Sequence, residues 1–191
     1  GSVGRAVAPY EALVLDDAVD IGLATESLSA FPELVTLPCY EWNHAVVAPI
    51  GHPVTNLEHI SLEDLAREPL VTYHPSFAGR ARIDRAFALR QLAPDIVLEA
   101  IDSDVIKTYV RLGLGIGIVA EMAMRDEPSG GDLVTRPVGH LFGQNVARVA
   151  FKRGVYLRNF IYAFAELISS RLSRTLIQRA ISGDASADYE L

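Results

Sequence analysis

Short apolar runs alternate along this chain with segments of helical periodicity, and this alternation restricts the possible folds more than any other feature. The apolar runs have the length of buried strands, and the segments between them repeat apolar residues at helical spacing. Strands that alternate with helices are typical of an α/β layer with a largely parallel sheet. We predict strands at residues 21–24, 45–48, 70–73, 96–101, 114–120 and 146–151.

Capping residues and apolar stripes place the helices. Ser61, followed by Asp64, predicts one helix start, and Asp102 predicts a helix that runs to about residue 112. Other helices are expected to end near residue 15 and to cover residues 79–92. The last helix is expected to be long, because one apolar stripe joins Leu157, Phe160, Ile161, Phe164, Leu167, Ile168 and Leu172.

Two features do not fit a single α/β layer. A polar turn is predicted at Glu41–Trp42–Asn43, after the first strands, and the long final helix has no strands of its own nearby. A fold of two lobes accounts for both features. The middle of the chain would form one lobe, and the final helix would return to the first.

Charge and cysteine usage exclude several classes of protein. The formal net charge is -7 at pH 7, which repels phosphate backbones, so this chain should not hold nucleic acid well by itself. The single cysteine, Cys39, excludes an internal disulfide and fits a reducing compartment. The sequence shows no secretory signal, and its apolar runs are far shorter than the roughly 20 residues of a membrane span. We therefore expect a cytoplasmic protein that does not bind a membrane.

No residue pattern resembles a catalytic centre. The glycines at 113, 115 and 117 follow a helix and precede a strand, the reverse of a dinucleotide-binding loop. We interpret Gly113 as a helix cap and the other two as close-packing positions. The five histidines lack metal-ligand spacing, and Cys39 is expected to be buried. We predict no catalytic residues, no metal, no cofactor and no enzyme activity.

Small polar residues follow several predicted strands. Thr25–Ser27, Thr72–Arg80 and Asp102–Ser103 stand where ligands bind in open α/β sheets, beyond the carboxyl ends of strands. Free backbone N–H groups at Gly79 and Ser103 would favour an anion or a zwitterion. These residue types are also the commonest helix and turn caps, and a pure capping role remains an alternative.

Four ordered motifs carry a family resemblance. They are Asp20–Glu26, Leu37–Asn43, Pro69–Tyr73 and, most specific, Asp104–Gly115. Together they resemble the LysR family of transcriptional regulators and, within it, the cysteine-regulon (CysB-like) activators. The resemblance extends from about residue 13 to residue 182.

The resemblance implies an α/β fold of two Rossmann-like lobes of the periplasmic-binding-protein type, joined by two crossover strands. Lobe I would comprise residues 1–43 and 152–191, incomplete at its N-terminus, and lobe II residues 44–151. A small effector of the sulfate, thiosulfate or acetylserine class would bind between the lobes of a homodimer or tetramer. DNA would be bound only through an N-terminal helix-turn-helix domain that is missing from this chain. The controlled genes would serve sulfur assimilation and cysteine biosynthesis.

The resemblance also assigns ligand contacts. Thr25 and Trp42 match cleft positions, and the turn from Ser76 to Arg80 matches an anion-cradling loop. Relatives usually have Thr where this chain has Ala78, which removes one hydroxyl. The predicted ligand-binding residues are Thr25, Trp42, Thr72, Ser76, Phe77, Ala78, Gly79 and Asp102. An extracytoplasmic solute-binding protein for a small sulfur-containing anion shares the fold and is the alternative function.

Overall fold

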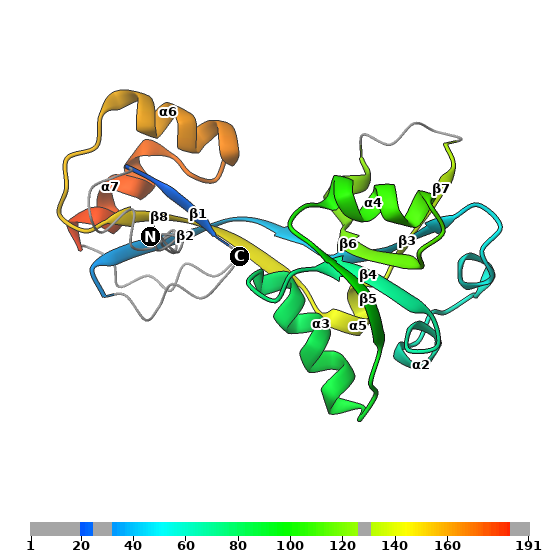
Figure 1. Cartoon of the computed structure of the whole chain (residues 1–191). Coiled ribbons are helices and arrows are strands. Elements are labelled where there is room, and N and C mark those ends of the chain that lie inside the picture. Colours follow the sequence, from blue (N-terminus) through cyan, green and yellow to red (C-terminus); the bar gives the residue numbers. More distant parts are fainter. Residues whose placement is uncertain (1–19, 25–31, 126–130, 184–191) are drawn as a thin grey trace, which may run out of the picture. The chain divides into compact units, whose positions relative to one another are not determined.

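A computed structural model describes residues 20–24, 32–125 and 131–183 (Figure 1). The chain divides into two compact units, Trp42–Asn145 and Gly1–Glu41 with Val146–Leu191, and it passes from one unit to the other twice. The predicted lobe boundaries lie a few residues further along the chain and stay a prediction. The helix expected before residue 15 and Thr25 lie outside the described residues.

The unit Trp42–Asn145 contains a mixed sheet in the order β5-β4-β6-β3-β7. Strand β4 pairs in parallel with β5 and β6, whereas β3 pairs antiparallel with β6 and β7. The sheet is therefore only partly parallel, since β3 and β7 run opposite to their neighbours. Its strands are β3 (His44–Pro49), β4 (Pro69–Tyr73), β5 (Asp95–Ala100), β6 (Ile116–Ala120) and β7 (Leu133–Pro137).

Helices cover both faces of this sheet (Figure 1). On one face, α4 (Ser103–Arg111) packs Ile106 and Val110 against the strands. On the other, α3 (Ala78–Leu89) packs Ile83 and Phe87 together with α2 (Leu62–Leu65) and α5 (Gly139–Phe142). Two short 3-10 helices, η1 (Pro53–Asn56) and η2 (Glu121–Met124), complete the unit.

The glycine run behaves as a cap and a packing site. Gly113 follows α4 with φ +78°, the left-handed region that favours glycine. A Cβ on Gly115 would lie 2.1 Å from the carbonyl oxygen of Pro69, and one on Gly117 would lie 2.5 Å from Val47 Cγ1. Neither position tolerates a side chain, which confirms the close-packing interpretation.

The other unit is built around β1 (Gly22–Ala24), β8 (Asn145–Lys152) and β2 (Leu34–Trp42), which lie in that order. Strands β1 and β8 are antiparallel. Cys39 is buried as predicted, and its thiol donates a hydrogen bond to the carbonyl of Ala147 at 2.9 Å. Burial raises the pKa of this thiol.

Two predictions of secondary structure are wrong. Glu41 and Trp42 end β2 and do not form a turn; Pro38 inside this strand weakened the sequence signal. The long final helix is two helices, α6 (Asn159–Ile168) and α7 (Arg174–Ser182). Ser173 starts the second helix by accepting a hydrogen bond from the N–H of Leu176, and part of the apolar stripe on α6 is exposed.

Candidate ligand-binding edge of the mixed sheet

The carboxyl ends of three parallel strands meet at one edge of the mixed sheet. Strands β4, β5 and β6 end there at Tyr73, Ala100 and Ala120. The antiparallel strand β3 begins at the same edge, with His44 opposite Ala120. This edge therefore has the position at which α/β sheets bind small ligands.

Tyr73 holds the edge together. Its hydroxyl lies 2.6 Å from Ser103 Oγ, at the start of α4, and accepts a hydrogen bond from the N–H of Ala120 at 3.0 Å. The next residue, His74, donates its N–H to the carbonyl of Ala100 at 2.9 Å. These contacts fix three strand ends relative to one another.

A tight turn leads from β4 into α3. The N–H of Phe77 donates to the carbonyl of His74 at 3.0 Å, and Ser76 Oγ lies 2.9 Å from His74 Nδ1. Ser76 and Phe77 are exposed. No side chain in the described part of the chain caps the start of α3, which leaves the positive end of the helix dipole open.

Arg80 lies in the first turn of α3, but its guanidinium is already hydrogen-bonded to other groups of the protein. Its guanidinium donates to Asp84 Oδ1 at 2.7 Å, to Glu99 Oε1 at 2.8 Å and to the carbonyl of Tyr73 at 2.8 Å. Burial disfavours the charge, but the hydrogen bonds to the two carboxylates outweigh it and raise the pKa of Arg80. Arg80 therefore anchors α3 to the strands, and an anion at this turn would rely on neutral donors.

The buried ring of His44 packs against Gly79, on the inner side of the same turn. Its ring is fully buried, with its centroid 5.0 Å from that of Trp42 and 5.3 Å from that of Phe142. A Cβ on Gly79 would lie 3.0 Å from Trp42 Cη2 and 3.2 Å from His44 Nε2, so glycine allows α3 to approach the two rings. Burial lowers the pKa of His44 to about 4, and the backbone of Gly79 offsets only part of this effect. Nε2 has no hydrogen-bond partner within the described residues.

The structure brings several predicted ligand-binding residues together. Trp42 and Gly79 are in contact range, and Ser76, Phe77 and Ala78 form the turn and the first residue of α3. These positions stay predictions as ligand contacts, as does Thr25.

Thr72 and Asp102 have structural partners. Thr72 is fully buried and donates its hydroxyl to the carbonyl of Ile118 at 3.2 Å. Asp102 accepts the N–H of Val105 at 2.8 Å and caps α4, as the alternative interpretation expected.

Sequence reasoning placed Tyr73 at this strand end without giving it a role, and it missed His44. Tyr73 ends an apolar strand and looks like one more core residue, although its hydroxyl joins three elements. His44 is a polar residue at the start of the otherwise apolar strand Ala45–Ala48, and this is the signal that could have identified it.

Comparisons with known proteins agree with this fold. The chain is 54% identical to the HTH-type transcriptional regulator CysB of Burkholderia cenocepacia over 179 residues, which are 94% of this chain and 56% of that protein. It is 44% identical to the regulator SsuR of the same organism over 165 residues, 86% of this chain and 53% of that protein. The crystal structure of the cofactor-binding domain of the Cbl transcriptional regulator superposes with a TM-score of 0.82 at 41% identity, covering 91% of this chain and 76% of that one.

Two α/β units, each with its own sheet, define a domain of the periplasmic-binding-protein type. Residues 8–173 match the sequence model of a protein family, the LysR substrate binding domain, and the chain belongs to this family. Both the predicted fold class and the predicted resemblance are confirmed. The chain spans about half the length of the curated relatives it matches.

Proposed function

We propose that this chain is the effector-sensing part of a LysR-type transcriptional regulator of sulfur assimilation or cysteine biosynthesis genes. The family membership and the names of the relatives, CysB and SsuR, support this proposal over an enzyme or an extracytoplasmic solute-binding protein. The regulator would act in the cytoplasm and bind DNA through an N-terminal domain. Among the described helices, none is long and apolar enough to cross a membrane.

The effector would be a small anion or zwitterion held at the turn Ser76–Gly79. The observation that carries this assignment is the uncapped start of α3 at the shared carboxyl edge of the strands. Helix N-termini stabilise anions through free N–H groups and the helix dipole. Because the nearby guanidinium of Arg80 is already paired, neutral donors would supply the contacts.

Isothermal titration with sulfate, thiosulfate, O-acetylserine and N-acetylserine tests the assignment. At least one of these ligands should bind. Ser76→Ala should weaken the binding of that ligand, because the Ser76 hydroxyl is exposed at the turn. Ser170→Ala, an exposed serine in the other unit, is the matched control and should bind unchanged. Failure of all four ligands to bind a full-length regulator would end the sulfur-effector assignment and leave the family assignment intact.

Ala78→Thr adds the hydroxyl that the family resemblance leads us to expect at this position. One hydrogen bond to a charged ligand contributes about 1.5–3 kcal/mol, so binding of the same ligand should tighten by about ten-fold or more. Titration of both proteins side by side measures this. Equal affinity would remove residue 78 from the proposed contacts.

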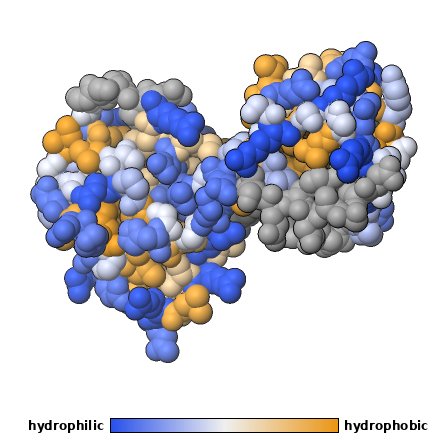
Figure 2. Space-filling model, turned by 180° about the vertical axis from the view of Figure 1, so that it is seen from behind, coloured by the Kyte–Doolittle hydropathy of each residue, from blue (hydrophilic) through white to orange (hydrophobic). Residues whose placement is uncertain are grey.

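The regulator would also form a homodimer or tetramer. On the face shown in Figure 2, hydrophobic patches lie among hydrophilic residues in each unit. Helix α6 alone exposes Phe160, Phe164 and Leu167. Sedimentation of the chain at micromolar concentration should therefore report a dimer or a larger species, and a monomer at every concentration would contradict this part of the proposal.

A further inference from the structure

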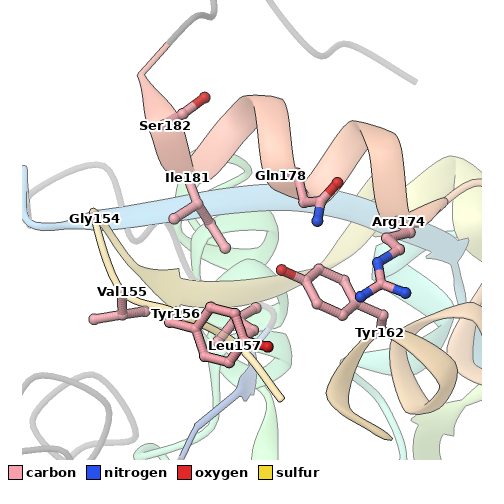
Figure 3. Close-up of a pocket in the computed structure, with 9 residues that line it drawn as sticks. All are labelled: Gly154, Val155, Tyr156, Leu157, Tyr162, Arg174, Gln178, Ile181 and Ser182. Atoms are coloured by element: carbon pink, nitrogen blue, oxygen red, sulfur yellow. The ribbon is translucent and has the colours of Figure 1, made fainter. Parts of the chain in front are cut away.

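A pocket lies in the unit Gly1–Glu41 with Val146–Leu191 (Figure 3). It opens between α7 and the segment that joins β8 to α6, and its volume is ≈ 240 Å³. Any ligand bound here is therefore small.

The polar end of this pocket is formed by Arg174, Gln178 and Tyr162. Figure 3 shows the first two on the side of α7 that faces Tyr162. Arg174 is an exposed residue whose guanidinium lies over the Tyr162 ring, 4.7 Å from its centroid, and donates to Asn159 Oδ1. No carboxylate among the described residues forms an ion pair with it, and its other N–H groups remain available.

Two further polar groups face the same space. Within the described residues, neither the Tyr162 hydroxyl nor the Gln178 amide has a hydrogen-bond partner. Ser182 also lines the pocket, but its hydroxyl already donates to the carbonyl of Arg179 at 3.0 Å. Arg174, Tyr162 and Gln178 therefore line the pocket with donors from two helices, and within the described residues only the Arg174 guanidinium has a hydrogen-bond acceptor.

The opposite end of the pocket is apolar. Leu157 and Ile181 are 2% and 6% exposed and form its floor. Tyr156, which is 87% exposed, forms part of the rim. A ligand that fits both ends has an anionic head and a short apolar body.

We propose that this pocket binds a small carboxylate that carries a short apolar group. A planar guanidinium with free N–H groups matches a carboxylate geometrically and electrostatically, and the apolar floor accommodates the rest of the molecule. The tyrosine hydroxyl and the glutamine amide supply further donors to the carboxylate oxygens. The site shares no residue with the turn at α3, so it does not depend on the function proposed above.

Phenylacetate and its neutral analogue phenylacetamide test the proposal by ¹⁵N NMR titration of the 191-residue chain. Phenylacetate should shift the resonances of α7 and of residues 154–157 at millimolar concentration. Loss of a charged partner costs about ten-fold or more in affinity, so phenylacetamide should bind correspondingly weaker, as should phenylacetate to Arg174→Gln. Tyr162→Phe removes one hydrogen bond to the charged carboxylate and should weaken phenylacetate binding by about ten-fold or more.

Arg179→Gln is the matched control. Arg179 is an exposed arginine on the same helix that does not line the pocket, so phenylacetate affinity should stay within about two-fold. The proposal is overturned if phenylacetate leaves the pocket resonances unchanged, if it binds Arg174→Gln as tightly as the unmodified chain, or if Arg179→Gln weakens binding equally. Shifts confined to the α3 turn would also overturn it.

Discussion

Two helices start side by side at the carboxyl edge of the mixed sheet, and their starts are built in opposite ways. Helix α4 closes its own N-terminus, because Asp102 accepts the N–H of Val105. Helix α3 starts at Phe77, which supplies no such cap within the described residues. Instead, α3 is fixed from behind by the buried side chains of Arg80 and His44.

The difference shows how a fold can keep one helix start open and still hold it rigidly. A side-chain cap satisfies N–H groups with an oxygen from the protein, which leaves less for a ligand. The side chains of Arg80 and His44 fix α3 without bonding to the backbone N–H groups of its first turn. The open start of α3 is therefore the one suited to an anion, and the variants below test this contrast in order of decreasing effect.

Removing the anchor Arg80 should produce the largest loss of stability. Arg80→Ala leaves Asp84 and Glu99 without their partner and the carbonyl of Tyr73 without its donor. Because both carboxylates are partly exposed, we expect a loss of about 2–4 kcal/mol in the free energy of unfolding, less than for a fully buried pair. Urea denaturation measures this loss.

Arg82→Ala is the control for this variant. Arg82 is an exposed arginine two residues further along α3, and its replacement should change the free energy of unfolding by no more than about 0.5 kcal/mol. If the two variants lose equal stability, Arg80 is not an anchor and the contrast between the two helix starts loses its basis.

His44 should make the stability of the chain depend on pH. In the unfolded chain its pKa is 6.5, and in the folded chain about 4, so the unfolded state takes up the proton first as the pH falls. The contribution of neutral His44 to the free energy of unfolding is therefore complete above about pH 6.5 and is lost as the pH falls from 6.5 to 4. The loss corresponds to about 3 kcal/mol.

The measurement is the difference in unfolding free energy between the unmodified chain and His44→Gln at each pH, because carboxylates also titrate at the acidic end. Trp42, the single tryptophan, contacts the His44 ring and reports unfolding by fluorescence. A difference that is constant from pH 7 to pH 4 would show that His44 is not held neutral by burial.

The capped helix start could be predicted from the sequence, whereas the anchored one could not. Asp102 ahead of a helical segment, and Ser61 followed by Asp64, are local patterns, and both caps form as expected. The anchors of α3 depend on residues distant in sequence, since Arg80 reaches Glu99 and His44 packs against Gly79. Periodicity predicts that such residues exist but not which of them meet.

The same reasoning explains the errors in the fold. Strand β2 was missed because Pro38 interrupts its pattern, and α6 and α7 were joined because their apolar residues share one period across Ser169–Ser173. The predicted turn Ser76–Gly79 lies at the sheet edge because strand order, which the sequence does not contain, places β4 between β5 and β6.

Phe77→Asp would give α3 the cap that α4 has. The new carboxylate would accept an N–H of the first turn and place a negative charge where the effector is proposed to bind. Effector affinity should therefore fall by about ten-fold or more, while the helix itself gains up to about 1 kcal/mol. Phe77→Ser, which caps without charge, should cause a smaller loss, and unchanged titration curves for both variants would place the effector elsewhere.

Asp102→Ala removes the cap of α4 and should have the smallest effect. Loss of an N-cap costs about 0.5–2 kcal/mol, which urea denaturation of the chain can resolve. Asp102→Asn keeps a capping oxygen and should recover most of this loss, so the pair separates the cap from the charge. If Asp102 only caps α4, effector affinity should be the same in both variants as in the unmodified chain. If Asp102→Ala weakens the effector more than it weakens the fold, Asp102 contacts the ligand as the resemblance implied. In that case the effector site includes the start of α4 as well as the start of α3, and the contrast between the two helix starts does not hold.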